Sequence, residues 1–216
     1  MQNKIDITLK NIKKNNMQSF FAEKTEDIVP LLKTLIPKGA TVGVGGSVTL
    51  QQSGVLDLLR SGDYVFYDRN KEGLTPEEVS EIMAKSLTAD VFICSSNAIT
   101  QNGQLYNVDG RANRIAAICY GPKSVIIVAG ANKIVEDIYE AKQRVKTIAA
   151  PKNAKRLSCN TPCEKLGHCV SAFSDGAEIC DGCQAEFRIC SNYLISAKQM
   201  VKDRIKVVLC REELGY

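Results

Sequence analysis

Short apolar runs alternate with amphipathic stretches along most of this chain, and this alternation constrains its fold more than any other feature. Runs of this kind are usually strands that are buried on both faces, whereas apolar residues at a spacing of 3.6 are typical of helices that cover a sheet. The sequence therefore predicts an α/β fold with a mainly parallel sheet flanked by helices. The predicted strands are at residues 40–44, 64–67, 91–94, 123–128 and 205–209, with a further short segment at 193–195.

Helices are expected between these strands. Thr75, Pro76 and Glu78 form a helix-start signature, with Thr75 as the cap, Pro76 at the first helical position and Glu78 closing a capping box. Asn102-Gly103 is a hairpin turn signal, so residues 104–108 are expected to pair back as a strand. The predicted helices are an amphipathic first helix that includes Ile5, Leu9, Ile12, Phe20 and Phe21, followed by residues 28–36, 48–59, 75–87 and 134–145.

Length and composition exclude several classes of protein. The 216 residues are enough to bury a substantial core, with 44% hydrophobic residues and no apolar run long enough to span a membrane. A net charge of +4 and the absence of Trp give little support for nucleic-acid binding, and we expect a cytoplasmic protein. The expected organisation is a core at residues 1–158, a cysteine-rich loop at 159–190, and a C-terminal segment at 191–216 that returns to the core.

A glycine-rich turn follows the first predicted strand. Glycines at a strand-to-helix turn let a ligand approach the backbone closely, and free amides and hydroxyls there attract an anion. The spacing matches neither a dinucleotide fingerprint nor a Walker loop, and a tight turn with a hydroxyl cap is the alternative interpretation. The candidate anion-binding residues of this turn are Gly45, Gly46, Ser47 and Thr49.

Polar residues gather after the next predicted strands. Arg114 and a lysine beside backbone amides could bind a carboxylate or phosphate, and Asp109 could accept a hydroxyl proton, which makes Asp109 and Arg114 the candidate catalytic residues. Each residue alone is equally well explained as a turn former or a solvated helix residue. The further candidates for ligand binding are Asn97, Asn113 and Lys133.

Several of these segments together resemble the LUD domain of lactate-utilisation proteins, over about residues 5 to 210. The segments that carry the resemblance are 45–50, 97–103, 108–114, 121–123 and 130–133. The resemblance implies a fold similar to the sugar-phosphate isomerase and CoA-transferase superfamily. It also implies a bacterial, cytosolic role in the oxidation of lactate to pyruvate, alongside iron–sulfur or flavin partner proteins. The family supplies no settled catalytic residue, and a fold does not fix a reaction.

Six cysteines are concentrated in the predicted loop, beside His168, the only histidine. Thiolates favour iron–sulfur clusters or zinc, and four of the six would suffice for either; free or redox-active thiols are the remaining alternative. Some stand-alone LUD proteins are similar here, with a cysteine-rich tail that ends in Arg-Ile-Cys, as at residues 188–190. His168 could be a ligand, a general base or a plain loop residue. The candidate ligands are Cys159, Cys163, Cys169, Cys180, Cys183 and Cys190.

Two other sets of residues have simpler interpretations. Cys94, Cys119 and Cys210 are expected to be buried as small hydrophobic side chains. A basic run is expected to be a solvated face, with a docking patch for an acidic redox partner or an anionic cofactor such as CoA as the alternative. This run consists of Lys142, Arg144, Lys146, Lys152, Lys155 and Arg156.

Three functions are compatible with these patterns. The first is a component of the oxidation of lactate or a related small hydroxy acid, possessing an iron–sulfur cluster. The second is an isomerase or transferase that acts on a small anionic metabolite, such as a sugar phosphate or a CoA ester. The third is a non-catalytic protein that senses a metabolite or the redox state.

Overall fold

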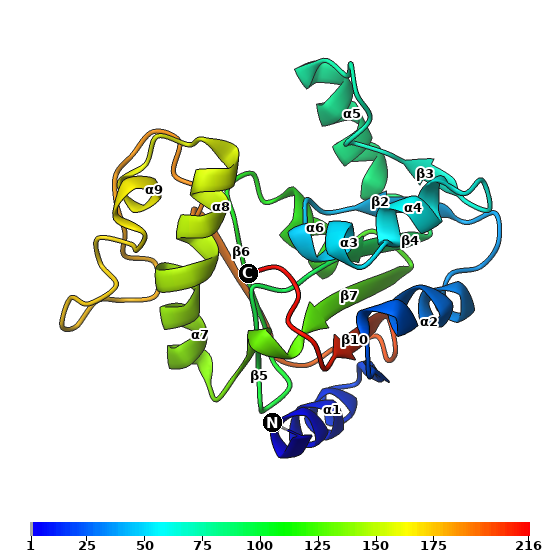
Figure 1. The fold of residues 1–216 in the computed structure, drawn as a ribbon, viewed down its shortest axis with the longest axis horizontal. Helices are drawn as coiled ribbons and strands as arrows, with labels where there is room; N and C mark the ends of the chain where they lie inside the picture. The colour runs from blue at the N-terminus through cyan, green and yellow to red at the C-terminus, as the bar shows by residue number, and fades with distance from the viewer. Residues whose placement is uncertain (1) are drawn as a thin grey trace.

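The computed structural model describes residues 2–216, and its main sheet has six strands that are all parallel (Figure 1). The strand order is β1-β10-β7-β4-β2-β3, so the last strand of the chain lies between the first and the seventh. The α/β fold predicted from the sequence is confirmed. The strands are β1 Gln18–Ala22, β2 Thr41–Val44, β3 Val65–Tyr67, β4 Val91–Cys94, β7 Ser124–Gly130 and β10 Ile205–Cys210.

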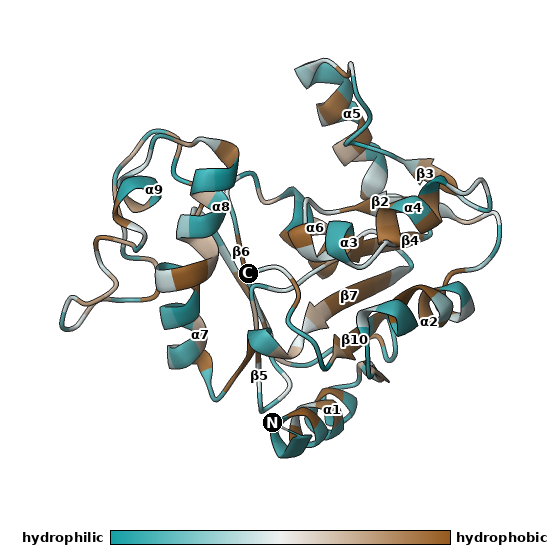
Figure 2. Ribbon diagram, in the orientation of Figure 1, coloured by the Kyte–Doolittle hydropathy of each residue, from teal (hydrophilic) through white to brown (hydrophobic). Residues whose placement is uncertain are grey.

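Helices cover both faces of the main sheet, which explains why its strands are continuously apolar. Along β7, Ile126 and Val128 face one core, and Val125, Ile127 and Ala129 face the other, as the two-residue period of a strand requires. Figure 2 shows these hydrophobic strands between helices with polar outer faces. The first core includes residues of α2 Ile28–Leu35, α3 Val48–Gln52 and α4 Val55–Arg60, and the second includes residues of α1 Gln2–Lys14 and α6 Asn113–Cys119.

A second sheet of four strands, in the order β8-β5-β6-β9, lies beside the main one. The predicted hairpin at Asn102-Gly103 forms its centre, where β5 and β6 pair antiparallel. Tyr106 and Val108 of this sheet pack with Ala141 and Val145 in a third core. The elements of this part are β5 Ala98–Thr100, β6 Leu105–Asp109, β8 Ile134–Val135, β9 Asn192–Ser196, α7 Ile138–Arg144, a π-helical turn Val145–Ala149, α8 Ala150–Leu157 and α9 Pro162–Leu166.

The remaining helix, α5 Pro76–Ser86, begins as the sequence predicts. The Thr75 hydroxyl accepts a hydrogen bond from the backbone N–H of Glu78, and the Glu78 carboxylate accepts one from the backbone N–H of Thr75. At its other end, Ser86 fits closely against Gly43 of β2, where any side chain on Gly43 would overlap the Ser86 Cβ. The helix is thereby held against the main sheet at β2.

Two of the predicted helices in the amino-terminal part of the chain are wrong in part. Phe20 and Phe21 are not in the first helix but in β1, because the helix ends before Asn16, which has a left-handed backbone conformation (φ 61°). The helix predicted over residues 48–59 is divided into α3 and α4. Gly54 separates them with a φ of 69°, a conformation that interrupts a right-handed helix.

The helix predicted over residues 134–145 is also wrong at both ends. Ile134 and Val135 form β8, where their branched side chains suit a strand that pairs with β5. The helix begins only after Asp137, whose carboxylate accepts a hydrogen bond from the backbone N–H of Glu140. It then continues through the π-helical turn into α8 and ends at Leu157. None of the helices in residues 2–216 combines the length and apolar character that crossing a membrane requires.

Gly103 should be intolerant of a side chain, because the hairpin turn packs directly against α1. A Cβ at Gly103 would lie 2.5 Å from the backbone nitrogen of Ile12, and the φ of Gly103 is 77°. We expect Gly103→Ala to lower the free energy of unfolding in urea by about 3 kcal/mol, from left-handed strain plus backbone overlap.

Gly73→Ala is the matched control, since Gly73 has a similar φ of 80° but nothing within 4 Å of the added Cβ. We expect it to cost only the strain, about 1 kcal/mol. Equal losses of stability in the two variants would contradict the close approach of α1 and the hairpin.

Candidate functional site

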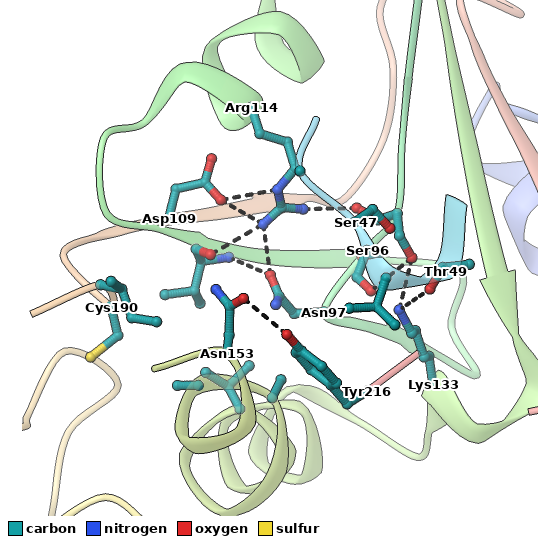
Figure 3. Close-up of a pocket in the computed structure, with 18 of the residues that line it drawn as sticks. Ser47, Thr49, Ser96, Asn97, Asp109, Arg114, Lys133, Asn153, Cys190 and Tyr216 are labelled. Atoms are coloured by element: carbon teal, nitrogen blue, oxygen red, sulfur yellow. Dashed lines mark hydrogen bonds and ion pairs between the residues drawn. The ribbon is translucent and has the colours of Figure 1, made fainter. Parts of the chain in front are cut away.

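A polar pocket of about 110 Å³ lies at the carboxyl ends of β2, β4 and β7 (Figure 3). This end of a parallel sheet is where α/β proteins commonly bind ligands. Segments from far apart in the sequence meet here, including the π-helical turn, α8 and the C-terminal Tyr216. We call this the central pocket, and its polar lining residues include Ser47, Thr49, Ser95, Ser96, Asn97, Asp109, Arg114, Lys133, Asn153, Arg156 and Tyr216.

Lys133 is almost completely buried in the wall of the central pocket, with 3% of its surface exposed. Its Nζ donates hydrogen bonds to the Thr49 Oγ1 (2.9 Å) and the Ser95 Oγ (2.8 Å). It forms no ion pair with a carboxylate anywhere in residues 2–216. Burial, together with the nearby positive charges of Arg144 and Arg114, lowers the pKa of Lys133 to about 7. Lys133 is therefore a buried amine that changes its charge near neutral pH.

Every nitrogen of the Arg114 guanidinium donates a hydrogen bond to an acceptor in the pocket wall. Its Nε and Nη2 both donate to the Asp109 Oδ1, at 3.0 and 2.6 Å. Its Nη1 donates to the backbone oxygen of Ser95 and to the Asn107 side chain, and its Nη2 also donates to the Asn97 Oδ1. The second Asp109 oxygen accepts from the backbone N–H of Ile115. Arg114 and Asp109 are thus a buried, fully hydrogen-bonded pair in the pocket wall.

The other residues predicted for ligand binding lie at different depths around this pair. Ser47 caps α3, and its hydroxyl accepts from the backbone N–H of Leu50. Gly45 is buried where a Cβ would lie 3.0 Å from the Arg114 Cδ, so a glycine there makes room for the arginine. Gly46 is at the pocket rim. Asn113 borders only a wider groove outside the central pocket.

The predicted basic run is not a continuous solvated face, because Arg144 and Lys146 are buried. Arg144 donates to the backbone oxygens of Asn132 (3.1 Å) and Asn97 (2.6 Å), and burial lowers its pKa to about 10. The π-helical turn that follows Arg144 brings Val145 and Ala149 to the pocket. Arg144 therefore adds positive charge beneath the central pocket instead of facing a partner.

Sequence reasoning missed several residues around this site. Tyr216 and Asn153 line the pocket and are hydrogen-bonded to each other, with the Tyr216 hydroxyl donating to the Asn153 Oδ1 at 3.0 Å. Arg69 and Arg111 line the adjoining groove together with Arg156. Burial lowers the pKa of Arg69, as do the charges of the other two arginines. No local pattern identifies these residues, because only the fold brings them together.

The cysteine-rich loop packs beside the second sheet, and four of its six cysteines line one cavity. These are Cys163, Cys169, Cys183 and Cys190, and we call the space between them the cysteine cavity. Burial raises the pKa of the Cys163 thiol, and the other three cysteines raise it further. Cys190 also lines the central pocket, so the two cavities share a wall.

The other cysteines and the histidine lie outside the cysteine cavity. Cys159 borders the wider groove and Cys180 is exposed. His168 contacts the backbone oxygen of Cys169 and packs against the ring of Phe173. Cys94 and Cys210 are buried as predicted, but the prediction for Cys119 is wrong, since it is exposed at the end of α6.

The thiols are not arranged around a single point. In residues 2–216, no three His, Cys, Asp or Glu side chains are grouped as ligands of one metal ion. The cysteine cavity has about 20 Å³ of free space, which is room for about one water molecule. The chemistry of its four thiols nevertheless fits a soft-metal group, which would have to part the loop from α7 and α8 on entering.

Arg114→Lys should destabilise the protein strongly, because a lysine cannot satisfy the acceptors of the guanidinium fork. We expect the free energy of unfolding in urea to fall by about 3 kcal/mol, mostly from the Asp109 Oδ1 and the Ser95 backbone oxygen, which lose their guanidinium donors. Arg60→Lys is the control, because the Arg60–Asp68 pair is at the surface and should lose less than about 1 kcal/mol. A loss for Arg114→Lys no larger than that of the control would contradict its role in joining the pocket wall.

Comparison with known proteins agrees with this architecture. The fold is similar to the crystal structure of a DUF162 family protein from Deinococcus radiodurans, with a TM-score of 0.52, 14% sequence identity and coverage of 98% of each chain. No curated protein matches the sequence. The family model described as the LUD domain matches residues 5–210. The chain therefore belongs to the LUD domain family, whose name associates it with lactate utilisation.

Proposed function

We propose that this protein binds a small carboxylate of the lactate and pyruvate class in the central pocket. The observation that carries the proposal is the buried Lys133, which has two hydroxyl partners and no carboxylate partner. The cationic side chains Lys133, Arg114 and Arg156 line the pocket. The charge of Arg144 acts on Lys133, and Asp109 is the acidic side chain in the pocket wall. A buried excess of positive charge is stabilised by an anionic ligand.

The size and lining of the pocket support a ligand of about three carbons. A space of about 110 Å³ suits a hydroxy or oxo acid but excludes a whole nucleotide or CoA molecule. Besides the charge of Lys133, the pocket offers the hydroxyls of Ser47 and Ser96 and the amide of Asn153. Such groups match the hydroxyl or carbonyl oxygen that lies next to the carboxylate in this class of ligand.

In this proposal the protein is a component of the oxidation of lactate or a related hydroxy acid. That reaction breaks the O–H bond and the C–H bond on one carbon and forms a C=O bond, releasing two protons and two electrons. Lys133 in its protonated form holds the carboxylate next to the reacting carbon, and the two protons leave to solvent. The electrons require an acceptor, which an iron–sulfur or flavin partner protein would supply. Asp109 and Arg114 act as positioning residues, because their polar atoms already hold the pocket wall together.

A second candidate rests on the groove beside the central pocket. Arg69, Arg111 and Arg156 line this groove and form no ion pair in residues 2–216. Clustered arginines bind phosphate groups, so the groove suits the phosphates of a CoA ester whose acyl end enters the pocket. This arrangement would favour an isomerase or transferase that acts on a phosphorylated metabolite. If the protein binds the carboxylate but catalyses neither the oxidation nor an isomerase or transferase reaction, it would instead be a sensing protein.

Binding of L-lactate and pyruvate, measured by calorimetry between pH 6 and pH 9, tests the first proposal. Lys133 attracts an anion only when protonated, and the carboxylate ligands are ionised throughout this range. We therefore expect the affinity to be highest below pH 7 and to fall by up to about tenfold per pH unit above the pKa of Lys133. Ligand binding itself raises that pKa, so the decline begins at the pKa of the free protein, about 7, and levels off at the higher pKa of the complex.

Lys133→Met should weaken binding at pH 6 by about a hundredfold and abolish the pH dependence, since it removes the charge but keeps much of the volume. Lys33→Met, at an exposed position on α2, should bind as the wild type does. Saturable binding of CoA or a sugar phosphate, with none of lactate or pyruvate, would overturn the proposal in favour of the second candidate. Affinity for lactate that is unchanged in Lys133→Met would overturn the assigned role of Lys133.

A further inference from the structure

The cysteine cavity is a site that the pocket chemistry above does not use. We propose that Cys163, Cys169, Cys183 and Cys190 are the four thiolate ligands of an iron–sulfur cluster with four irons. Such a cluster takes one thiolate at each iron, so its ligands stand around a volume instead of meeting at a point. This assignment is independent of the ligand of the central pocket, and it selects four of the six cysteines in the loop.

The fold makes that selection. Cys163 lies in α9. The other three cysteines lie in the irregular chain between α9 and β9, yet all four line the same cavity. Cys159 instead borders the wider groove that Arg69, Arg111 and Arg156 line. Cys180 is exposed and lines shallow depressions on the outer side of the loop. The two excluded cysteines therefore serve as internal controls.

Three of the four sulfur atoms already have a polar partner. The Cys163 Sγ lies 3.3 Å from the Thr161 hydroxyl, and the Cys169 Sγ lies 3.5 Å from the Ser171 hydroxyl. The Arg188 Nε donates to the Cys190 Sγ at 3.2 Å. A donor such as Arg188 stabilises a thiolate over a thiol, and hydrogen bonds to sulfur are among the features by which proteins tune iron–sulfur clusters.

Two further groups in the cavity wall lack partners that an anionic cluster would provide. The Tyr106 hydroxyl finds no hydrogen-bond partner within residues 2–216, and only 1% of the residue is exposed. A buried hydroxyl donor of this kind costs free energy unless an acceptor reaches it. Lys146 is also buried in this wall, where its Nζ donates to the Ser171 hydroxyl and the Glu178 backbone oxygen but has no carboxylate partner in residues 2–216. Cluster and thiolate sulfurs would supply an acceptor for Tyr106 and negative charge for Lys146.

The loop is held mainly by polar contacts, in which Arg188 donates to the backbone oxygens of Cys180, Cys183 and Cys190. Between residues 159 and 190, its regular secondary structure is one helix of five residues, α9. Its buried apolar residues are few, and two of them are the proposed ligands Cys163 and Cys169, beside Ala172. A cluster would add a covalent cross-link to a segment with so small an apolar core. The small free space in the cavity means that the loop moves outward as the cluster forms, and each thiol releases its proton on binding iron.

Anaerobic reconstitution of the full chain with ferrous iron and sulfide tests the proposal. We expect about four irons and four sulfides per chain, a broad visible absorbance band and a protected loop in limited proteolysis. Cys163→Ser and Cys183→Ser should each lose at least half of the bound iron and most of the absorbance. Cys159→Ser and Cys180→Ser should keep the wild-type iron content.

Far-ultraviolet circular dichroism of each variant before reconstitution separates loss of a ligand from loss of the fold. Tyr106→Phe gives a second readout, since removing a hydroxyl donor near the sulfurs should lower the midpoint potential of the cluster without changing its iron content. Zinc bound at one ion per chain in place of iron, or no metal uptake by the folded wild type, would overturn the proposal. Equal loss of iron in Cys159→Ser or Cys180→Ser would overturn the assigned ligand set.

Discussion

The buried guanidinium of Arg114 is the interaction on which the arrangement of the two sheets depends. It extends from α6 and reaches the backbone of Ser95, just after a strand of the main sheet. It also binds the Val108 carbonyl and the Asp109 carboxylate on β6 of the second sheet. One side chain thus joins a helix and both sheets by charge-assisted hydrogen bonds in a buried setting, where such bonds are strong when all of them are made. Without it, the carboxyl ends of β4 and β6 would present uncompensated acceptors to each other.

The same arrangement explains why a lysine can be buried nearby without a counter-ion. Because Asp109 is fully engaged by Arg114 and by the backbone N–H of Ile115, it does not neutralise Lys133. The lysine therefore keeps two neutral hydroxyl partners and a pKa near 7. The Arg114–Asp109 pair thus contributes to the central pocket indirectly, by leaving Lys133 free for an external anion.

The sequence was informative wherever a local signal decides the structure. The apolar strands, the capping box at Thr75 and the hairpin turn at Gly103 are each specified by neighbouring residues, and all three are found in the structure. Local patterns failed where tertiary contacts decide. Phe20 and Phe21 match a helical pattern, but the edge of the main sheet beside β10 recruits them as a strand. Arg144 and Lys146 are typical of a solvated run, but the π-helical turn between α7 and α8 carries them into the interior.

Candidate site residues were predictable to the extent that they follow strand ends. Ser47, Asn97 and Lys133 could be expected to converge because they follow parallel strands, whose carboxyl ends share one edge, whereas Asp109 ends an antiparallel strand of the second sheet. The hydrogen bonds that engage Arg114 completely could not be predicted, because they depend on the angle between the two sheets. Nor could the position of Tyr216, which reaches the pocket only because β10 runs through the middle of the main sheet.

The position of Cys190 links the two cavities through the backbone of the second sheet. The backbone N–H of Ser191 donates to the Asp109 carbonyl, and the Asn192 side chain donates to the Gly110 carbonyl. Gly110 also lets Ile189 approach closely, since an added Cβ there would lie 3.3 Å from the Ile189 Cα. Residues 189 and 190 are therefore fixed against the end of β6, between the central pocket and the cysteine cavity. A group bound by Cys190 would therefore be anchored to the same backbone that carries Asp109 of the pocket wall.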